Sequence, residues 1–444
     1  MSPVLFPILL SLSLARFVKA QRYGTLIQEI HPPLSWQNCI IGLCTARAGK
    51  VVIDANWRRY GARTNGDTSY CYDGIWHPEF YPNEEQMNDT CALEGIPSYS
   101  DLGVSTNGNA LHLQFVTEGP PSRNVGSRVY LMADDNTYAI FKPLAQEITF
   151  DVDMSNLPCG IAADIHFAEM AADGGIAESG GWNTAGAKYG TGYCGAQCPR
   201  DVRFINGRIN PNPPPIPPGL GGSGFCCAEM DLWQANSLST VMKAHPCKFQ
   251  DPGLRRYKCY EDECGASAPS GTKYNGVCDP DGCDFNPYRM GKTSFYGPGK
   301  TVDTTKKLTV VTQFVTSNGT PAGSLVEIRR KYVQNGVTIS NSLVNVPNVA
   351  AFNSITSSYC NQQKAAFVDE TSFQAKDGLG GLTEAFKRGM VLVLSIYADP
   401  DAHMLWLDGP YPPWVNPNSP GVTRGICADT TGVPADLEAI IPTP

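Results

Sequence analysis

The sequence is poor in charged residues, and its few charges do not favour a basic surface. Asp, Glu, Lys and Arg make up 17% of the 444 residues, and the formal net charge is −8. An acidic chain with so little positive charge is poorly suited to nucleic acid or to an anionic membrane, so neither partner is expected. A neutral surface with 10% aromatic residues instead suits an uncharged ligand.

Long hydrophobic runs are also missing. The run at 4–14 is too short for a membrane span, and small residues at a cleavage site follow it. We therefore expect a secretory signal peptide at 1–20 and a secreted, extracellular mature chain at 21–444. Two sequons, at 88–90 and 318–320, are candidate sites for glycosylation, although either could stay unused.

The usual metal and phosphate signatures are missing as well. The chain has neither repeated Cys-x-x-Cys pairs nor closely spaced histidines, and no glycine-rich phosphate loop. We expect no metal and no organic cofactor. The sixteen cysteines fit the disulfides of a secreted protein better than zinc. Cys226 and Cys227 are adjacent and cannot easily bond each other, so two other segments should converge on them.

Helical patterns are scarce, and only 380–388 looks helical. Short segments rich in β-branched and aromatic residues predict strands at 50–54, 110–116, 129–132, 147–153, 165–170, 307–314 and 390–397. The 44 glycines and 35 prolines favour turns between them. This pattern predicts an all-β sandwich.

Long irregular segments separate the strands. They cover 173–206, 210–224, 246–298 and 399–424, and most cysteines fall in or beside them. Loops of this length are usually functional or tied down. The proline run at 211–218 could be an interdomain linker, but cysteines on both sides favour a surface loop in a single domain.

The stretch 226–236 reads Cys-Cys-Ala-Glu-Met-Asp-Leu-Trp-Gln-Ala-Asn. Because side chains alternate along a strand, Glu229 and Asp231 should share one face. Met230 and Leu232 should share the opposite face. Two acids on an otherwise apolar strand are costly to bury, so we expect a solvent-exposed, functional face.

Tryptophans stand beside hydrogen-bonding side chains at positions 57, 233 and 406. An aromatic face flanked by polar groups matches the two surfaces of a sugar ring. Taken singly, Trp57, Trp233 or Trp406 is equally well interpreted as a core residue.

The stretch 227–236 resembles the active-site strand of glycoside hydrolase family 7, the secreted cellobiohydrolases and endoglucanases. That family's pattern is Glu-x-Asp-x-x-Glu-Ala-Asn. The resemblance continues through nearly all of the mature chain, in the segments 31–36, 51–57, 183–194, 278–283, 293–299 and 404–408. The loop lengths are similar to those of the tunnel-forming cellobiohydrolases.

The resemblance implies a two-sheet, jelly-roll-like (concanavalin-type) sandwich with long disulfide-tied loops that form a substrate cleft or tunnel. Cellulose or cello-oligosaccharide chains would be the partners, and the protein would be a monomer. From the resemblance we also expect that the catalytic domain lacks the family's last strand and that it carries neither a linker nor a cellulose-binding module. The implied disulfides use all sixteen cysteines, as Cys39–Cys44, Cys71–Cys91, Cys159–Cys427, Cys194–Cys227, Cys198–Cys226, Cys247–Cys278, Cys259–Cys264 and Cys283–Cys360.

The resemblance also implies the site. Glu229 takes the nucleophile position, Asp231 the assisting carboxylate and Gln234 the acid/base position, and His245 belongs to the catalytic centre. The implied substrate contacts are Asn56, Trp57, Arg128, Tyr193, Gln197, Asp201, Arg203, Asp281, Asp284, Arg289, Trp406 and Arg424. A retaining mechanism needs two carboxyls about 5–5.5 Å apart. Positions 229 and 234 are separated by an odd number, so a bulge or sharp bend near 232–233 is required.

Gln234 departs from the family pattern, because an amide cannot deliver a proton to the leaving oxygen. General acid–base catalysis contributes roughly 10²–10⁴-fold to the rate, so turnover should fall steeply. Further departures from the family occur at Arg59, Ala162, His166, Gly195, Ala196, Arg203, Lys273 and Tyr397.

Two hypotheses follow. The first is a slow, retaining β-1,4-glucan hydrolase in which another group, with His166 as a candidate, supplies the proton. The second is a catalytically silent protein that holds cello-oligosaccharides. A purely structural role is disfavoured by the retained Trp57, Trp406, Arg424 and Glu229.

Overall fold

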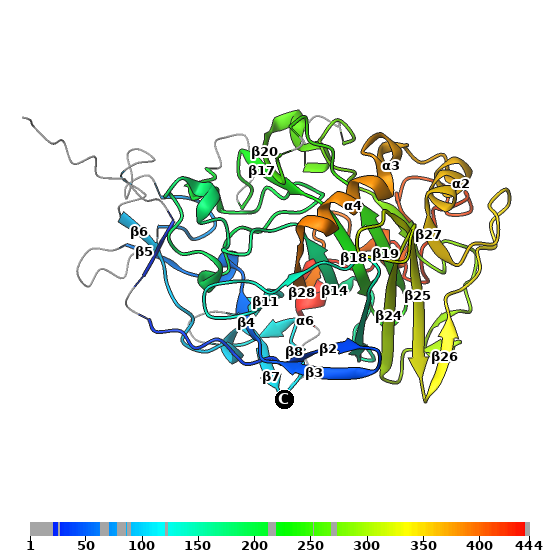
Figure 1. Ribbon diagram of the computed structural model, residues 1–444, viewed down its shortest axis with the longest axis horizontal. Coiled ribbons are helices and arrows are strands. Elements are labelled where there is room, and N and C mark those ends of the chain that lie inside the picture. The colour runs from blue at the N-terminus through cyan, green and yellow to red at the C-terminus, as the bar shows by residue number, and fades with distance from the viewer. Residues whose placement is uncertain are drawn as a thin grey trace, which may run out of the picture.

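The computed structural model describes residues 21–24, 27–62, 71–77, 86, 90–119, 123–211, 219–251, 253–267 and 273–439. Two β-sheets and several helices surround the core (Figure 1). The expected signal peptide at 1–20, the sequon residue Asn88 and the proline run at 212–218 lie outside the described residues. Within the described part, no helix is long and apolar enough to span a membrane.

The larger sheet carries the stretch singled out above. Its strands follow the order β21 (Cys283–Phe285), β19 (Thr240–His245), β18 (Glu229–Ala235), β14 (Ile161–Ala168), β28 (Met390–Ala398), β11 (Ser127–Met132) and β4 (Lys50–Ile53). Strand β12 (Ile140–Phe141) also pairs with β28. All neighbouring strands in this sheet are antiparallel.

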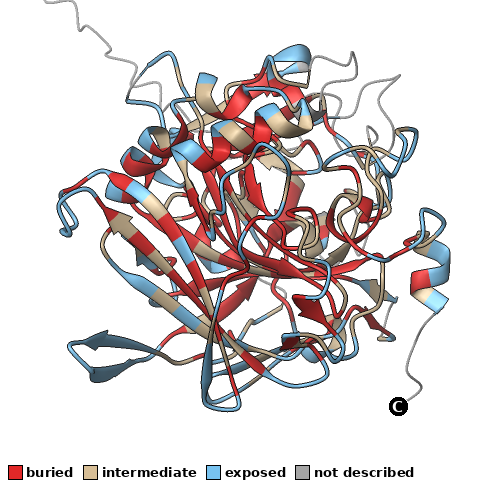
Figure 2. Cartoon of the chain, turned by 90° about the vertical axis from the view of Figure 1, so that its right-hand side faces the viewer, coloured by how far each residue is buried: buried red, intermediate tan, exposed pale blue. Residues whose placement is uncertain are grey.

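The second sheet covers the back of the first. Its strands follow the order β13 (Glu147–Val152), β24 (Leu308–Thr316), β25 (Leu325–Gln334) and β26 (Val337–Ser340), and β27 (Ser354–Thr356) pairs with β25. Phe167 and Met230 of the larger sheet pack in one cluster with Phe314 and Ile328 of the second. Buried residues fill the centre of the molecule, and exposed residues dominate the outer loops (Figure 2). The predicted two-sheet sandwich is confirmed.

Shorter strands tie the loops together. They are β1 (Arg22–Tyr23), β2 (Trp36–Ile40), β3 (Leu43–Arg47), β5 (Tyr60–Ala62), β6 (Cys91–Leu93), β7 (Val104–Asn107), β8 (Ala110–Leu113), β9 (Val116–Thr117), β10 (Asn124–Val125), β15 (Phe204–Ile205), β16 (Arg208–Ile209), β17 (Ser223–Cys227), β20 (Arg256–Tyr260), β22 (Tyr296–Gly297) and β23 (Val302–Asp303). Each predicted strand segment contains a strand, and 110–116 is divided between β8 and β9. Sequence patterns missed β25, and β20 and β21 lie inside a segment interpreted as irregular.

The predicted helix is confirmed as α4 (Gly378–Arg388), whose buried residues Leu382 and Phe386 join the core between the sheets. The expectation of a single helix is wrong. The structure also has α2 (Ser357–Phe367), α3 (Ser372–Ala375), α5 (Leu405–Asp408) and α6 (Pro434–Ala439). Thr356 caps the N-terminus of α2, and its side chain accepts a hydrogen bond from the Tyr359 N–H.

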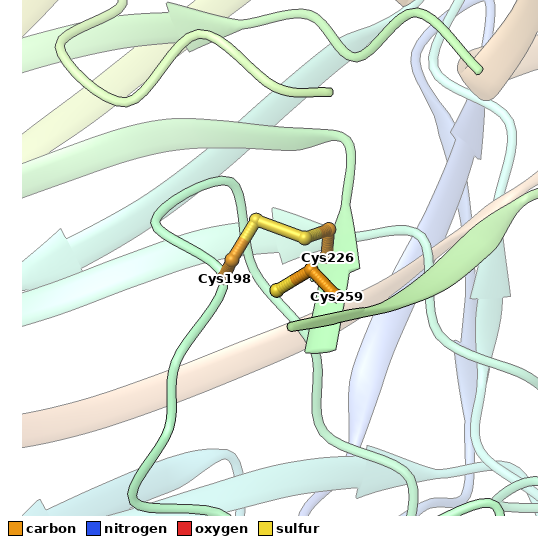
Figure 3. Close-up of side chains that lie close together, drawn as sticks. All are labelled: Cys198, Cys226 and Cys259. Carbon is orange, nitrogen blue, oxygen red and sulfur yellow. A yellow bond between two sulfur atoms is a disulfide. The ribbon is translucent and has the colours of Figure 1, made fainter. Parts of the chain in front are cut away.

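All eight disulfides implied by the resemblance are present. The adjacent cysteines of β17 bond Cys194 and Cys198, as their inability to bond each other required. Figure 3 shows that Cys259 lies beside the Cys198–Cys226 bond, and the three sulfur atoms lie within 4.8 Å of one another. The disulfides therefore hold the segment 194–198 against β17, immediately before β18.

Candidate active site

Strand β18 contains the bulge that the spacing of positions 229 and 234 required. Asp231 pairs with His166 and Trp233 pairs with Ile165, which leaves Leu232 as an extra residue. Leu232 and Trp233 consequently both pack in the core. Trp233 is thus a core tryptophan, whereas Trp57 and Trp406 are partly exposed.

The bulge returns Gln234 to the face of the two acids. Gln234 pairs with Asp164 of β14, and Asp231 pairs with His166. Asp164 and His166 share one face, because their side chains are joined by a hydrogen bond. Glu229, Asp231 and Gln234 therefore lie on one face of the larger sheet, with the core on the other.

This face is covered, so the expectation of a solvent-exposed face is wrong. Glu229 is 4% exposed, Asp231 0% and Gln234 5%. The Ala196 N–H donates a hydrogen bond of 2.9 Å to Glu229 Oε2, and a Cβ atom added to Gly195 would lie 2.7 Å from the same oxygen. Side-chain alternation shows which face a residue occupies but not which loop lies above it.

Asp231 is held by a buried histidine. His245 Nε2 lies 3.2 Å from Asp231 Oδ2, and His245 Nδ1 donates to the Asp279 carbonyl at 2.9 Å. Burial lowers the pKa of His245, but the charge of Asp231 outweighs it and raises that pKa to about 9. Burial raises the pKa of Asp231, but His245 and the nearby Lys243 hold it well below its ordinary value. Asp231 is therefore ionised and His245 is an imidazolium at neutral pH.

Glu229 has the opposite tendency. Burial, and then the negative charge of Asp231, raise the pKa of Glu229 above its ordinary value. The environments of the two acids thus push their pKa values apart, which is the pattern expected of carboxyls with different chemical roles.

The ligand atoms of Glu229, Asp231 and His245 lie within 4.8 Å of one another, close enough to be considered as a metal site. The imidazolium form of His245 repels a cation, and its hydrogen bonds to Asp231 and to the Asp279 carbonyl account for both of its nitrogens. We therefore interpret this cluster as a charge-paired group and not as a metal site.

Gln234 and His166 leave polar atoms without partners. Gln234 Oε1 and His166 Nε2 are buried and form no hydrogen bond with the described residues. His166 Nδ1 lies 2.8 Å from Asp164 Oδ2. Sequence reasoning missed Asp164, since the strand predicted at 165–170 begins one residue after it.

The expected substrate contacts form two groups. In the first, Arg128 lies between two rings, 3.4 Å from the centroid of Tyr193 and 5.6 Å from that of Trp57. Asn56 Nδ2 donates to the Asp201 carbonyl at 3.1 Å, and the Arg203 N–H donates to Asn56 Oδ1 at 3.4 Å. These six residues are brought together at the β4–β11 side of the sheet.

The second group lies beyond β19. Arg289 is paired with Asp284 at 2.5 Å, Asp281 accepts from Tyr274 at 2.6 Å, and Trp406 Nε1 donates to Asp399 at 2.8 Å. Arg424 stands 5.7 Å from the ring centroid of Tyr411. Gln197 Nε2 donates to the Pro280 carbonyl at 3.4 Å and so joins the nucleophile's loop to this group.

Lys243 was not anticipated from the sequence. It pairs with Asp231 across β18 and β19, and its Nζ lies 3.9 Å from the ring centroid of Trp406. Burial lowers the pKa of Lys243, and Asp231 opposes that effect. A lysine beside a tryptophan could have been noticed only once the fold had brought the two together.

Two buried carboxyls on one sheet of a β-sandwich are compatible with a glycoside hydrolase, and the comparisons with known proteins establish that class. The family model described as glycosyl hydrolase family 7 matches residues 23–444. A GH7 family cellobiohydrolase from Daphnia pulex is 43% identical, with a TM-score of 0.88 over 94% of this chain and 95% of that chain. A cellobiohydrolase from Melanocarpus albomyces complexed with cellotetraose is 37% identical, with a TM-score of 0.86 over 94% and 95%. The endocellulase EGI of Humicola insolens is 33% identical, with a TM-score of 0.78 over 95% of both chains. The chain belongs to glycosyl hydrolase family 7.

Proposed function

We propose that this protein is a secreted hydrolase of β-1,4-glucans, cellulose or cello-oligosaccharides, that retains the anomeric configuration. The observation that carries this proposal is the bulge at Leu232, which puts Glu229, Asp231 and position 234 on one face. The similarity to a cellobiohydrolase complexed with cellotetraose supports the substrate class. The eight disulfides support secretion, with 1–20 as the leader and 21–444 as one monomeric catalytic domain.

Glu229 is the nucleophile of the proposed mechanism. Its carboxylate, oriented by the Ala196 N–H, attacks the anomeric carbon and forms a glycosyl ester as the glycosidic carbon–oxygen bond breaks. Ester formation removes the charge of Glu229 and with it the repulsion from Asp231. Asp231 stays ionised because His245 holds it. The buried pair thus favours the covalent intermediate over the free enzyme.

The two groups of polar and aromatic residues would bind the glucan on either side of Glu229. Trp57 and Trp406 supply faces for sugar rings, and the remaining contacts supply hydrogen bonds to hydroxyl groups. These are Asn56, Arg128, Tyr193, Gln197, Asp201, Arg203, Asp281, Asp284, Arg289 and Arg424. Asn318 lies in the exposed turn between β24 and β25 and is the proposed glycosylation site.

Gln234 makes the enzyme slow on unactivated glucans. Its amide is close in shape to Glu but cannot exchange a proton, so binding is retained while both chemical steps lose their usual catalyst. The test compares wild type with Gln234→Glu on cellotetraose and on dinitrophenyl cellobioside. We expect wild type to hydrolyse the activated glycoside. The Glu variant should raise kcat on cellotetraose, at most by the roughly 10²–10⁴-fold that a general acid and base contributes. Failure of both proteins on both substrates would contradict the proposal.

A catalytically silent carbohydrate-binding protein is the second candidate. It is favoured by the buried Gln234 Oε1, which finds no partner in the described structure and is free to bind a sugar hydroxyl. Calorimetric titration with cellotetraose, followed by chromatography of the recovered sugar, separates the candidates. Tight binding with intact sugar and no reaction with the dinitrophenyl glycoside would identify the silent protein.

A further inference from the structure

Two side chains of β14 form a buried pair on the catalytic face. His166 is 2% exposed and Asp164 is 4% exposed, and His166 Nδ1 lies 2.8 Å from Asp164 Oδ2. Ser395 of β28 donates to the same carboxylate oxygen at 3.5 Å. His166 Nε2 has no hydrogen-bond partner within the described residues. A buried polar atom without a partner calls for an explanation, and a bound ligand is one.

The strand register places this pair beside the reaction centre. Ala168 pairs with Glu229, His166 with Asp231 and Asp164 with Gln234. Residues opposite each other on neighbouring antiparallel strands have Cβ atoms about 4.5–5.5 Å apart. His166 therefore lies on the strand next to β18. Along the strand direction it is placed between Glu229 and position 234, where the scissile bond would lie.

We propose that His166 is the general acid and base of this enzyme, in place of the carboxyl that Gln234 lacks, and that Asp164 positions it. This inference rests on the proposed hydrolase function. In the first step His166 Nε2–H protonates the glycosidic oxygen while Glu229 attacks the anomeric carbon and the carbon–oxygen bond breaks. In the second, neutral Nε2 takes a proton from water, whose oxygen bonds the anomeric carbon as Glu229 leaves.

The charges around His166 suit this role. Asp164 faces it from its own strand, Glu229 and Asp231 from β18, Tyr193 from the covering loop at 6.3 Å between ring centroids, and Tyr397 lies on β28 beside them. Burial lowers the pKa of the imidazole, but Asp164, followed by Glu229 and Asp231, raises it to about 9. His166 is therefore protonated at neutral pH, as the first step requires.

The two other cations that stand next to Asp231 are both engaged elsewhere. His245 uses one nitrogen for Asp231 and the other for the Asp279 carbonyl. Lys243 Nζ lies over the Trp406 ring. His166 Nε2, by contrast, has no partner among the described residues, and Lys243 is the competitor that the experiment must test.

The experiment measures kcat/KM on aryl cellobiosides whose leaving groups range from dinitrophenol to phenol. An activated leaving group needs no protonation, so its glycoside reports on Glu229 alone. We expect His166→Gln to lose roughly 10²–10⁴-fold on phenyl cellobioside and little on the dinitrophenyl glycoside in the glycosylation step. Azide can attack the glycosyl ester without a general base, so added azide should restore the turnover of His166→Gln. Lys243→Met should leave the leaving-group dependence unchanged.

The positioning role of Asp164 has its own readout. Asp164→Asn removes the charge that raises the pKa of His166, so the alkaline limb of the kcat/KM profile should move to lower pH. The pH dependence of the rate can also be compared between wild type and Gln234→Glu, which tests the proposal without changing His166. The wild-type rate should fall only near pH 9, whereas the Glu variant should lose activity at lower pH, as its carboxylic acid ionises. When it is combined with Gln234→Glu, the substitution His166→Gln should lower kcat/KM only slightly.

The outcomes separate the two proposals. If wild type fails even on dinitrophenyl cellobioside, the hydrolase proposal and the role of His166 both fall. If wild type hydrolyses only that activated glycoside, the hydrolase stands and the His166 proposal is overturned. The His166 proposal is also overturned if His166→Gln retains the wild-type leaving-group dependence. It is overturned as well if Lys243→Met shows the loss on phenyl cellobioside that is expected of His166→Gln. Retained cellobiose binding by His166→Gln shows that the variant is folded.

Discussion

The guanidinium of Arg330, on β25 of the second sheet, donates a hydrogen bond to the carbonyl of Leu232, the extra residue in the β18 bulge. A bulge leaves a ladder group unpaired, and a buried unpaired carbonyl costs free energy. Arg330 supplies the missing donor from across the core. The geometry that brings position 234 to the catalytic face is therefore supported by a residue of the opposite sheet.

Arg330→Met should weaken both the fold and the site. The substitution leaves the Leu232 carbonyl without a donor, so we expect the free energy of unfolding to fall by about 1–3 kcal/mol. Chemical denaturation and kcat on dinitrophenyl cellobioside measure the two effects. The control is Arg329→Met on the same strand, where the half-exposed side chain pairs with Glu327 and its loss should cost about 0–1 kcal/mol. Equal effects of the two variants would contradict the role given to Arg330.

His245→Gln should destabilise the protein in a pH-dependent way. The pKa of His245 rises on folding from 6.5 to about 9, so its pairing with Asp231 stabilises fully below pH 6.5 and is lost as pH rises through 9. Urea unfolding should show a deficit of about 3–5 kcal/mol near pH 6 that shrinks above pH 9. His112→Gln, an exposed position on β8, is the control and should show no such trend. A deficit that grows with pH would contradict the charge pairing.

Gly195→Ala should impair catalysis more than folding. The added Cβ would lie 2.7 Å from Glu229 Oε2, so either the carboxylate or its loop must move. A displacement of the nucleophile by about 1 Å can cost on the order of 10²-fold in rate. Gly380→Ala on α4 meets no atom within 4 Å and should leave the activity unchanged. Steady-state kinetics and thermal unfolding of both variants check this expectation.

Removing Cys194–Cys227 should cost more than removing Cys39–Cys44. The two bonds close 33 and 5 residues, for which chain entropy predicts losses of about 3.7 and 2 kcal/mol. Double alanine variants, unfolded in urea, measure the difference. Only the removal of Cys194–Cys227 should also reduce the activity, because this disulfide anchors the loop whose Ala196 N–H binds Glu229. Normal activity without Cys194–Cys227 would show that the loop is held by other contacts.

The sequence predicted strands where apolar residues alternate, and it failed where polar residues are buried. Strand β25 was not recognised, because three consecutive cations at 329–331 interrupt its apolar residues and one of them, Arg330, lies in the core. Helix α2 was missed because Gln363 and Lys364 are among its buried residues. No apolar stripe marks its inner face, so periodicity gave no indication of a helix.

The candidate site was assigned by family resemblance, and the bulge followed from the spacing of the two positions that the resemblance placed in the cleft. The segment 194–198 that covers Glu229 and Asp231 could not be placed from the sequence, because its position depends on the strand to which its disulfides attach it. Asp164 was missed since its significance comes from its neighbours: His166 two residues on and Gln234 on the next strand. Such a pairing exists only once the strand register is known.

The closeness of three sulfur atoms has a consequence for producing the protein. The sulfur atoms of Cys198, Cys226 and Cys259 lie within 4.8 Å of one another, and Cys259 stands beside the Cys198–Cys226 bond (Figure 3). A thiolate released at Cys259 could therefore attack the neighbouring bond and form a mispaired isomer. Material made in a reducing cytoplasm and oxidised later would contain such isomers, in which the loop over Glu229 is misplaced. Preparations for kinetics should come from an oxidising secretory host, with the cystine pairing verified by peptide mapping.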